Sequence, residues 1–393
     1  MIEAIKQNNA MFTKWRQDFH KYPEVSYQEH KTAEKIAEML RSFGVDEVHT
    51  GIGGTGLVGV LRGKYPSNKA VGLRADIDAL AMTEQSECDY KSKNNGAMHA
   101  CGHDGHITML LASAWYLAQE REFSGTVNFI FQTAEEELTG AMAMIDDGLF
   151  DRFPCDRIYG MHNMPGIPQG DIWVREGAIY ASCDRFDVEV QGRGGHAAFP
   201  SFVVDPTLVL SNIVMSAQTI VSRNISPIES SLISFTDMHC GVDTYNIVGA
   251  IGTMKGCFRS FNPEVHQMTL QRLESVVEGA AAVYGATAKL NVVPNGCPAV
   301  INHKGPAKLV TDIAAEMLGV DRVNANCEPL PGSEDFACML EHAEGAYFFL
   351  GNGKIGQKGG VSIHNAEYDF NDEIIPIGAS LFTKLVEREL APL

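Results

Sequence analysis

The stretch Met98-His-Ala-Cys-Gly-His-Asp-Gly-His106 is the densest cluster of possible metal ligands in the chain, with Cys101, His103 and His106 within six positions. An apolar pattern of helical spacing follows over residues 107–118, and Asp104 is its expected N-cap. A thiolate and an imidazole two residues apart do not share one face of a helix. We therefore expect Cys101 and His103 on a loop, where both can turn toward one ion.

Helical and strand patterns alternate around this cluster. The spacing predicts helices at 2–20, 29–43 and 107–118, and strands at 46–50, 57–62, 70–74, 126–131 and 157–161. The run at 126–131 is almost continuously apolar, which is typical of a strand covered on both faces. The sequence thus predicts an α/β fold in which a central sheet is flanked by helices and ligands bind at the carboxyl ends of the strands.

The pattern changes near residue 183. Residues 185–191 alternate apolar and polar, and strand-like runs at 231–237, 247–257 and 287–293 accompany helices at 206–223 and 263–283. The helix–strand alternation resumes after Pro298, with helices at 304–318 and 375–390. We therefore expect a discontinuous catalytic metal-binding domain of residues 1–182 and 298–393, with an α+β domain inserted at 183–297.

The glycine-rich run Gly51-Ile-Gly-Gly-Thr-Gly56 raises the alternative of a nucleotide site. No Gly-Lys-Ser/Thr follows it, and a strand pattern rather than a helix comes next. A glycine hairpin is the favoured interpretation.

The composition narrows the range of partners. A formal charge of −18, spread along the 393 residues, disfavours binding to nucleic acid or to an anionic membrane. No apolar stretch approaches the roughly 18 residues of a membrane span, and the first 21 residues lack the apolar core of a signal peptide. Nine cysteines without a paired framework favour reduced thiols and a cytoplasmic location.

Ligand-type side chains stand at the ends of several predicted elements. They are Cys101 and His103 before the 107–118 helix, Glu135, Glu136 and Glu137 after the 126–131 strand, His162 after the next strand, and His364 before the last helix. A two-metal hydrolytic site requires about five or six protein ligands, an open position for water and a nearby carboxylate that accepts a proton. This set of residues meets that requirement.

Two other chemistries use the same residues. A structural zinc site would favour paired Cys-x-x-Cys spacing, but the cluster holds one cysteine. A cysteine nucleophile, with Cys101 activated by a nearby histidine, would leave the adjacent glutamates without a role.

Six motifs together carry a resemblance to a known family. They are MHACGHDGH at 98–106, FQTAEE at 131–136, GMHNMP at 160–165, GRGGHAA at 192–198, SEDFA at 333–337 and IHNAEYDFND at 363–372. In this order they resemble the metal-dependent amidohydrolases that include hippurate hydrolase, N-acyl-amino-acid deacetylases and auxin-conjugate hydrolases. The resemblance spans nearly the whole chain.

The resemblance implies a pair of divalent metal ions with five ligands: Cys101, His103, Glu136, His162 and His364. Cys101 is the candidate bridge between the ions, which could be Zn, Mn, Co or Ni because imidazole, thiolate and carboxylate ligands suit all four. Glu135 matches the general base, which takes a proton from the attacking water and passes it to the leaving amine. Glu137 stands where the family usually has glycine, and no role is assigned to it.

The inserted domain resembles the family's lid, and three of its residues match positions that face the substrate. His196 would donate a hydrogen bond to the developing oxyanion, Arg259 would bind the substrate's α-carboxylate, and Asn246 would hold its amide. After Asn246-Ile247 this chain has Val248-Gly249-Ala250 where the family commonly has Pro-Asp. The substrate preference is therefore open.

Four other polar residues are expected to act indirectly. Asp76 and Asp78 match a family motif near the site, and we expect them to orient a ligand imidazole or to tie a loop. Capping of a turn after a strand is the alternative for both. His20 and His106 are possible supporting groups of the same kind.

The working hypothesis is a cytoplasmic dinuclear-metal hydrolase that cleaves the amide bond of a small-molecule N-acyl amino acid. A dipeptidase or carboxypeptidase with the same metals is the nearest alternative, and a ligand-binding homologue without catalysis is the third. The inserted domain offers a sheet edge and an outer face, so we expect a homodimer or a higher homo-oligomer. Whether His196 serves its own chain or a neighbouring subunit is open.

Overall fold

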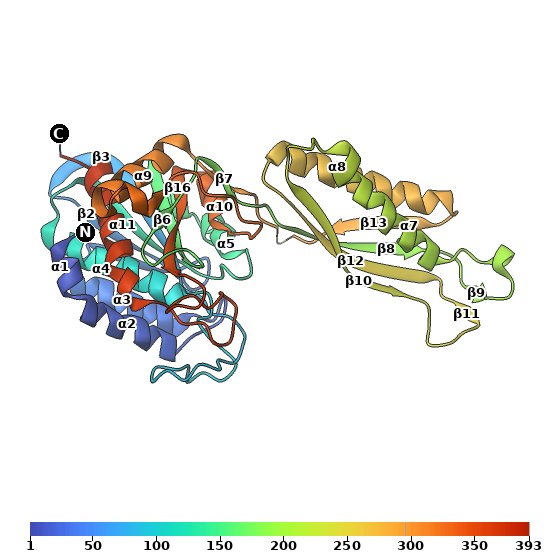
Figure 1. Cartoon of the computed structure of the whole chain (residues 1–393), viewed down its shortest axis with the longest axis horizontal. Coiled ribbons are helices and arrows are strands. Elements are labelled where there is room, and N and C mark those ends of the chain that lie inside the picture. The colour runs from blue at the N-terminus through green and yellow to red at the C-terminus, as the bar shows by residue number, and fades with distance from the viewer. Residues whose placement is uncertain (295, 393) are drawn as a thin grey trace. The chain divides into compact units, whose positions relative to one another are not determined.

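The computed structural model describes residues 1–294 and 296–392, which form two compact units (Figure 1). The larger unit holds residues 1–179, 300–328 and 334–392, and the smaller holds 180–294, 296–299 and 329–333. The segment 329–333, expected from the sequence in the larger domain, lies with the smaller unit. Among the described residues, no helix has the length and apolar character needed to cross a membrane.

The larger unit is built on a mixed sheet whose eight described strands run in the order β1-β2-β4-β3-β5-β16-β6-β15. Their bounds are β1 Glu47–Ile52, β2 Gly56–Arg62, β3 Tyr65–Asp76, β4 Ser124–Gln132, β5 Arg157–Pro165, β6 Ile172–Trp173, β15 Val323–Asn324 and β16 Glu344–Gly353. The glycine run 51–56 forms the predicted hairpin, in which β1 and β2 pair antiparallel. The central strands β4, β3, β5 and β16 are parallel, so their carboxyl ends share one edge.

Helices cover both faces of this sheet. On one face α4 (His103–Glu120) packs between the sheet and α2 (Asn9–Lys21), α3 (His30–Phe43) and α11 (Ile375–Glu389), which extend the main apolar core (Figure 1). The α1 helix (Glu3–Gln7) and the α9 helix (Lys304–Leu318) complete this layer. On the other face α5 (Gly140–Asp146) contacts α6 (Leu149–Arg152), α10 (Phe336–Leu340) and β4. The predicted α/β architecture is confirmed.

The strand order reverses at β3. The chain passes from β3 through α4 to β4 on one side of β3, and then through α5 and α6 to β5 on its other side. Because such crossovers are right-handed, a reversal of direction sends the two connections to opposite faces of the sheet. The loops after β3 and β4 therefore diverge and leave a crevice at the carboxyl edge, where open α/β sheets bind ligands.

The smaller unit is an antiparallel sheet covered on one face by two helices. Its strands run in the order β10-β12-β8-β13, and the period-two burial of β8 and β12 leaves the other face exposed. The elements are β8 Asp184–Gln191, β9 Gly195–His196, α7 Pro206–Thr219, β10 Ser231–Cys240, β11 Ile247–Val248, β12 Ile251–Ser260, α8 Pro263–Val283 and β13 Thr287–Val292. The helices α7 and α8 pack on the sheet to form a separate apolar core.

Three predicted elements differ from the structure. The 2–20 helix is interrupted at Asn8, whose side chain donates a hydrogen bond to the carbonyl of Ala4. The 247–257 strand is broken after Val248, because residues 247–248 pair with β9 instead of following β12. The predicted helix at 206–223 is α-helical only to Thr219, and a π-helical turn follows over Ile220–Asn224.

The expected N-cap of α4 was also wrong. Gly102 occupies the N-cap position with a left-handed φ of 92°, and Asp104 lies inside the first turn. The Asp104 carboxylate is instead engaged by Arg16 and His20, which belong to α2.

We predict that Leu110→Ala will lower the free energy of unfolding by about 2–5 kcal/mol, because Leu110 is fully buried where α4 meets the core. Urea denaturation will measure the loss. Glu120→Ala is the matched control, since Glu120 is exposed at the end of the same helix. A Leu110→Ala protein as stable as this control would contradict the packing described for α4.

Candidate metal centre

Cys101 and His103 lie where the long loop after β3 enters α4. Gly102 between them has a φ of 92°, a conformation that favours glycine. A Cβ atom there would lie 2.3 Å from the Asn163 side-chain oxygen and 2.5 Å from the Tyr368 hydroxyl. Glycine therefore permits the sharp turn that precedes the helix. Cys101 lies on the loop as expected, whereas His103 is the first residue of α4.

The glutamates lie on the loop that leaves β4, on the other side of the reversal in strand order. Ala134 has a φ of 49°, so the chain turns abruptly at the residue before Glu135. Gly140 closes this loop against the strand, since a Cβ atom there would lie 1.6 Å from the Thr133 carbonyl oxygen. His162 belongs to β5, and His364, with a φ of 60°, precedes α11.

These segments bring all six residues predicted for the metals and the base into one cluster. The Cys101 sulfur lies 3.3 Å from Nε2 of His162, and Nε2 of His364 lies 3.4 Å from a Glu136 carboxylate oxygen. Nε2 of His103 lies 3.9 Å from Glu135 and 4.0 Å from Glu136. Two triplets of donor atoms, Cys101/His103/His162 and Cys101/Glu136/His364, share the Cys101 sulfur.

The chemistry of this cluster fits a cation. Nε2 of His103 and Oε1 of Glu136 are buried, and in the described part of the chain neither has a hydrogen-bond partner. Buried polar atoms are rarely left unpaired, because each loses its hydration without compensation. A divalent ion would satisfy both atoms, and the mixture of imidazole, carboxylate and thiol donors suits a transition metal.

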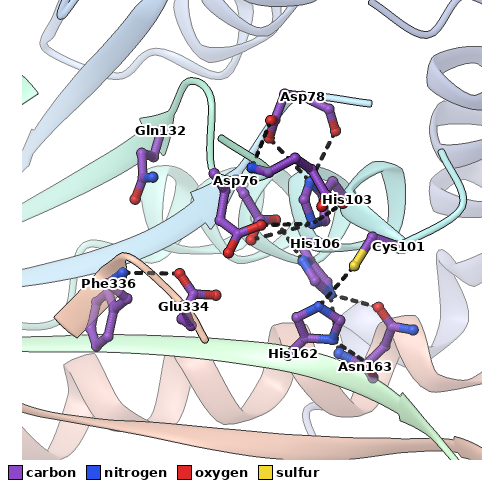
Figure 2. Close-up of polar contacts among 12 residues, drawn as sticks. Asp76, Asp78, Cys101, His103, His106, Gln132, His162, Asn163, Glu334 and Phe336 are labelled. Atoms are coloured by element: carbon purple, nitrogen blue, oxygen red, sulfur yellow. Dashed lines mark hydrogen bonds and ion pairs between the residues drawn. The ribbon is translucent and has the colours of Figure 1, made fainter. Parts of the chain in front are cut away.

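Asp78 orients His103. Its carboxylate and its carbonyl oxygen lie 3.2 and 2.9 Å from Nδ1 of the ring, which directs Nε2 into the cluster (Figure 2). The other carboxylate oxygen accepts hydrogen bonds from the Ser26 hydroxyl and from the backbone N–H of Glu136. This geometry is consistent with the expected positioning role of Asp78, because its carboxylate both orients the imidazole of His103 and ties the loop that carries Glu136.

Asp76 holds His106 beneath the cluster. Its carboxylate lies 2.6 Å from Nδ1 of His106, while Nε2 of the same ring lies 2.7 Å from the side-chain oxygen of Asn163 and 3.0 Å from its backbone nitrogen (Figure 2). The His106 ring in turn packs edge-on against His162, with 4.7 Å between ring centroids. Both His106 nitrogens are thus occupied, and His106 supports the ligand candidates without joining them.

Ionisation in the cluster is governed by burial and by excess negative charge. Burial raises the pKa of Glu135 well above its usual range, and the carboxylates of Glu334 and Glu136 raise it further. Burial and the carboxylates of Glu136 and Glu135 raise the pKa of the Cys101 thiol. Burial lowers the pKa of His162, which favours the neutral ring that binds metals. A cation is the missing counter-charge for the glutamates and the thiol.

These pKa directions also bear on the alternative chemistries. A nucleophilic cysteine is activated by surroundings that lower its pKa, whereas the surroundings of Cys101 raise it. The donor triplets around Cys101 contain one thiol, unlike a cysteine-rich structural zinc site. Both observations favour the hydrolytic metal site.

A buried charge network beside the glutamate loop was missed from the sequence. Arg74, at 1% exposure, donates to Glu334, Asp76 and Gln132 at 2.8 Å each. Asp335 accepts hydrogen bonds from the Gln132 side chain and the Ala141 backbone, and so ties both ends of the loop. The one signal in the sequence was the SEDFA motif, to which no role had been given.

His20 supports α4 from the N-terminal side. Its Nδ1 lies 2.8 Å from Asp104, the residue after His103, and its Nε2 lies 3.3 Å from Glu84. Burial alone would lower the pKa of His20, but the Asp104 carboxylate raises it to about 9. His20 is therefore a charged partner of Asp104, which Arg16 also contacts.

The three candidates for substrate binding lie in the smaller unit. β9 and β11 pair His196 with Ile247, so Asn246 lies beside His196, and the Ala197 N–H donates to the Asn246 carbonyl. Nδ1 of His196 accepts a hydrogen bond from Ala198, which assigns the ring proton to Nε2. Arg259 lies on β12, and its Nη1 donates to the Pro331 carbonyl and to the Ser333 hydroxyl.

Comparison with known proteins places the chain in a family. The model of Peptidase family M20/M25/M40 matches residues 72–388. The chain belongs to this family. It is an enzyme, a metal-dependent amidohydrolase of the M20 group, as the motifs in the sequence predicted.

Relatives of the M20 group match the chain over nearly its full length. Hippurate hydrolase from Campylobacter jejuni is 38% identical over 99% of both chains. Thermostable carboxypeptidase 1 from Saccharolobus solfataricus is 35% identical over 96% of both. A crystal structure of a dinuclear metal-binding M20 peptidase from Bacillus subtilis covers 99% of this chain and 100% of its own, with a TM-score of 0.85 and 30% identity.

We predict that Asp78→Asn will weaken binding of Zn²⁺ or Mn²⁺ by about 10- to 100-fold, because the variant loses the anionic partner of His103. Titration calorimetry of metal-free protein will measure the change. Asp156→Asn is the control, since the Asp156 carboxylate accepts from Ala70, toward the opposite end of β3. Equal affinities in the two variants would refute the positioning role of Asp78.

Proposed function

We propose that the protein is a dinuclear-metal hydrolase that cleaves the amide bond of N-acyl amino acids. The observation that carries this proposal is the buried cluster in which two donor triplets share Cys101 and Glu135 lies beside them. Hippurate, the substrate in the name of the C. jejuni relative, is itself an N-acyl amino acid. The cytoplasmic location inferred from the cysteines is part of the same proposal.

The ions would be held by Cys101, His103, Glu136, His162 and His364, with Cys101 between the two positions. Divalent ions in such a site lower the pKa of water and polarise a carbonyl group. Zn, Mn, Co and Ni all suit these donors. The His364 side chain is half exposed, whereas the other four ligand candidates are buried or nearly so. We therefore propose that substrate and water enter the site beside His364.

Glu135 would act as the general base. Its carboxylate lies beside the ligand candidates, yet among the described residues no hydrogen bond commits its side chain to a structural role. Burial and neighbouring carboxylates raise its pKa. A carboxylate with a raised pKa takes up a proton from water readily and can return it to the leaving amine. Glu136, one residue on, is held by the bond from its N–H to Asp78.

The smaller unit would bind the substrate. His196, with its proton on Nε2, is suited to donate to the carbonyl oxygen as negative charge develops. In the part of the chain that the structure describes, the Asn246 side chain is bonded only at its oxygen, which accepts from the Thr244 hydroxyl, so its amide N–H donors are available. Arg259 carries further N–H donors beyond those on Pro331 and Ser333, and we assign them to the α-carboxylate.

We also propose the domain limits 1–182 and 298–393 for catalysis and 183–297 for the lid, and a homodimer formed through the lid. The edge strand β10 leaves Leu232 and Met238 exposed, and unpaired strand edges are natural places for a second copy to pair. Whether His196 serves its own site or that of a second copy depends on this assembly.

Glu135→Gln is predicted to lower kcat by about 10²- to 10⁴-fold on N-benzoylglycine, because the amide can neither accept nor return the proton. Elemental analysis should find the metal content of the wild type. Glu137→Gln is the matched control two positions along the same loop, where the side chain is exposed, and it should turn over normally. Full activity of Glu135→Gln would contradict the role of Glu135 as the general base.

A peptidase is the second candidate, because thermostable carboxypeptidase 1 is also a close relative. The two functions differ in whether the acyl group carries a free α-amino group. We predict higher kcat/KM for N-acetyl and N-benzoyl amino acids than for dipeptides with the same C-terminal residue. The opposite order would assign the protein to the peptidases.

A further inference from the structure

The loop that carries Glu135 and Glu136 holds two residues in an unfavourable conformation. Ala134 and Leu138 have φ values of 49° and 58°, in the left-handed region that side chains rarely adopt. Such conformations persist only where the surroundings hold them. Since Ala134 directly precedes Glu135, whatever holds Ala134 also directs the proposed base.

A short segment from the N-terminal part of the chain supplies these restraints. The Ser26 hydroxyl donates to Asp78, which binds the Glu136 N–H, and the Tyr27 hydroxyl lies 2.6 Å from that of Thr139. The Glu29 side chain reaches the start of the loop. One of its carboxyl oxygens accepts from the Ala134 N–H at 3.0 Å and from the Thr133 hydroxyl at 2.9 Å.

The oxygen atoms around Glu29 form a closed ring. The second Glu29 oxygen lies 2.5 Å from the Thr55 hydroxyl, which lies 2.7 Å from the Thr133 hydroxyl, which donates back to Glu29. Three oxygen–oxygen contacts need three protons, but the two threonines supply two. An ionised Glu29 would leave one contact without a proton. A proton on the Glu29 carboxyl group completes the ring.

We infer that Glu29 is a positioning residue which holds Ala134, and through it Glu135, and that it does so as the neutral carboxylic acid. The neutral acid donates to Thr55, Thr55 donates to Thr133, and Thr133 and the Ala134 N–H donate to the other Glu29 oxygen. This inference rests on the proposed function for the role of Glu135, but the protonation state can be tested without turnover.

The surroundings of Glu29 agree with a neutral group. Its side chain is fully buried, and among the described residues no cationic group forms an ion pair with it. Burial raises the pKa of Glu29, hydrogen bonds from Thr55 and Ala134 oppose this, and the nearby Asp78 carboxylate raises it further. A buried carboxyl group without a counter-charge favours its protonated form.

If Glu29 is neutral, replacing it with glutamine should reduce kcat less than replacing it with aspartate. Glu29→Gln should keep kcat close to that of the wild type, because the amide N–H₂ can donate to Thr55 while the amide oxygen accepts from Thr133 and Ala134. Glu29→Asp should lower kcat by roughly 10²-fold, because the shorter side chain withdraws from Ala134 and displaces the base. KM and metal content should change little in either variant.

Glu24 provides the matched control on the same segment. Its carboxylate accepts from the N–H and hydroxyl of Thr32 in α3, and within the described part of the chain its side chain makes no hydrogen bond to the glutamate loop. Glu24→Asp should lower the thermal midpoint but keep kcat. A comparable loss of kcat in Glu24→Asp would mean that damage to the segment, and not the contact with Ala134, slows the reaction.

Infrared spectroscopy of protein labelled with ¹³C-glutamate tests the protonation of Glu29 separately from the proposed hydrolase function. At neutral pH the wild type should show the C=O band of a protonated carboxyl group that Glu29→Gln lacks, whether or not metal or substrate is present. Absence of that band, or wild-type kcat in Glu29→Asp, overturns the role of Glu29. A wild type that hydrolyses no N-acyl amino acid overturns the proposed function and leaves the infrared result standing.

Discussion

The larger unit depends on one buried carboxylate, that of Asp78. It lies just beyond β3 and interacts with the ring of His103, the hydroxyl of Ser26 and the backbone N–H of Glu136. These partners belong to the start of α4, to the N-terminal segment and to the loop after β4. A fully buried charge is stable only when its hydrogen bonds are made, so Asp78 requires these three segments to meet at one point.

The local spacing of apolar and polar residues was sufficient to predict much of the fold. The apolar run 126–131 lies inside β4, the 263–283 pattern coincides with α8, and the ligand-type residues at element ends do converge. These features depend on the period of the apolar residues and on the direction of parallel strands, both of which can be recognised in a linear sequence. The reversal of strand order at β3 then explains why the ends of separate segments meet.

The supporting groups could not be predicted in the same way. Glu29 stands just before an amphipathic helix, where a capping role is the natural expectation, but its side chain bonds Thr133, 104 positions further along. Arg74 lies in an apolar strand and pairs with Glu334, 260 positions away. The prediction of Asp104 as an N-cap was wrong for the same reason, because its carboxylate binds Arg16 and His20 instead. Partners so distant are set by tertiary packing, which no local pattern records.

The pairing of β5 with β16 also has a consequence for how the chain folds. The candidate ligands are spread from Cys101 to His364, and β5 pairs with β16, which begins at Glu344. Contacts over such sequence distances form slowly, because the entropy of closing long loops is lost before the contacts compensate for it. The cluster is therefore complete only when the sheet is complete, and a bound ion would favour the finished fold over every partly folded form. Metal retention would thus report on folding as well as on catalysis.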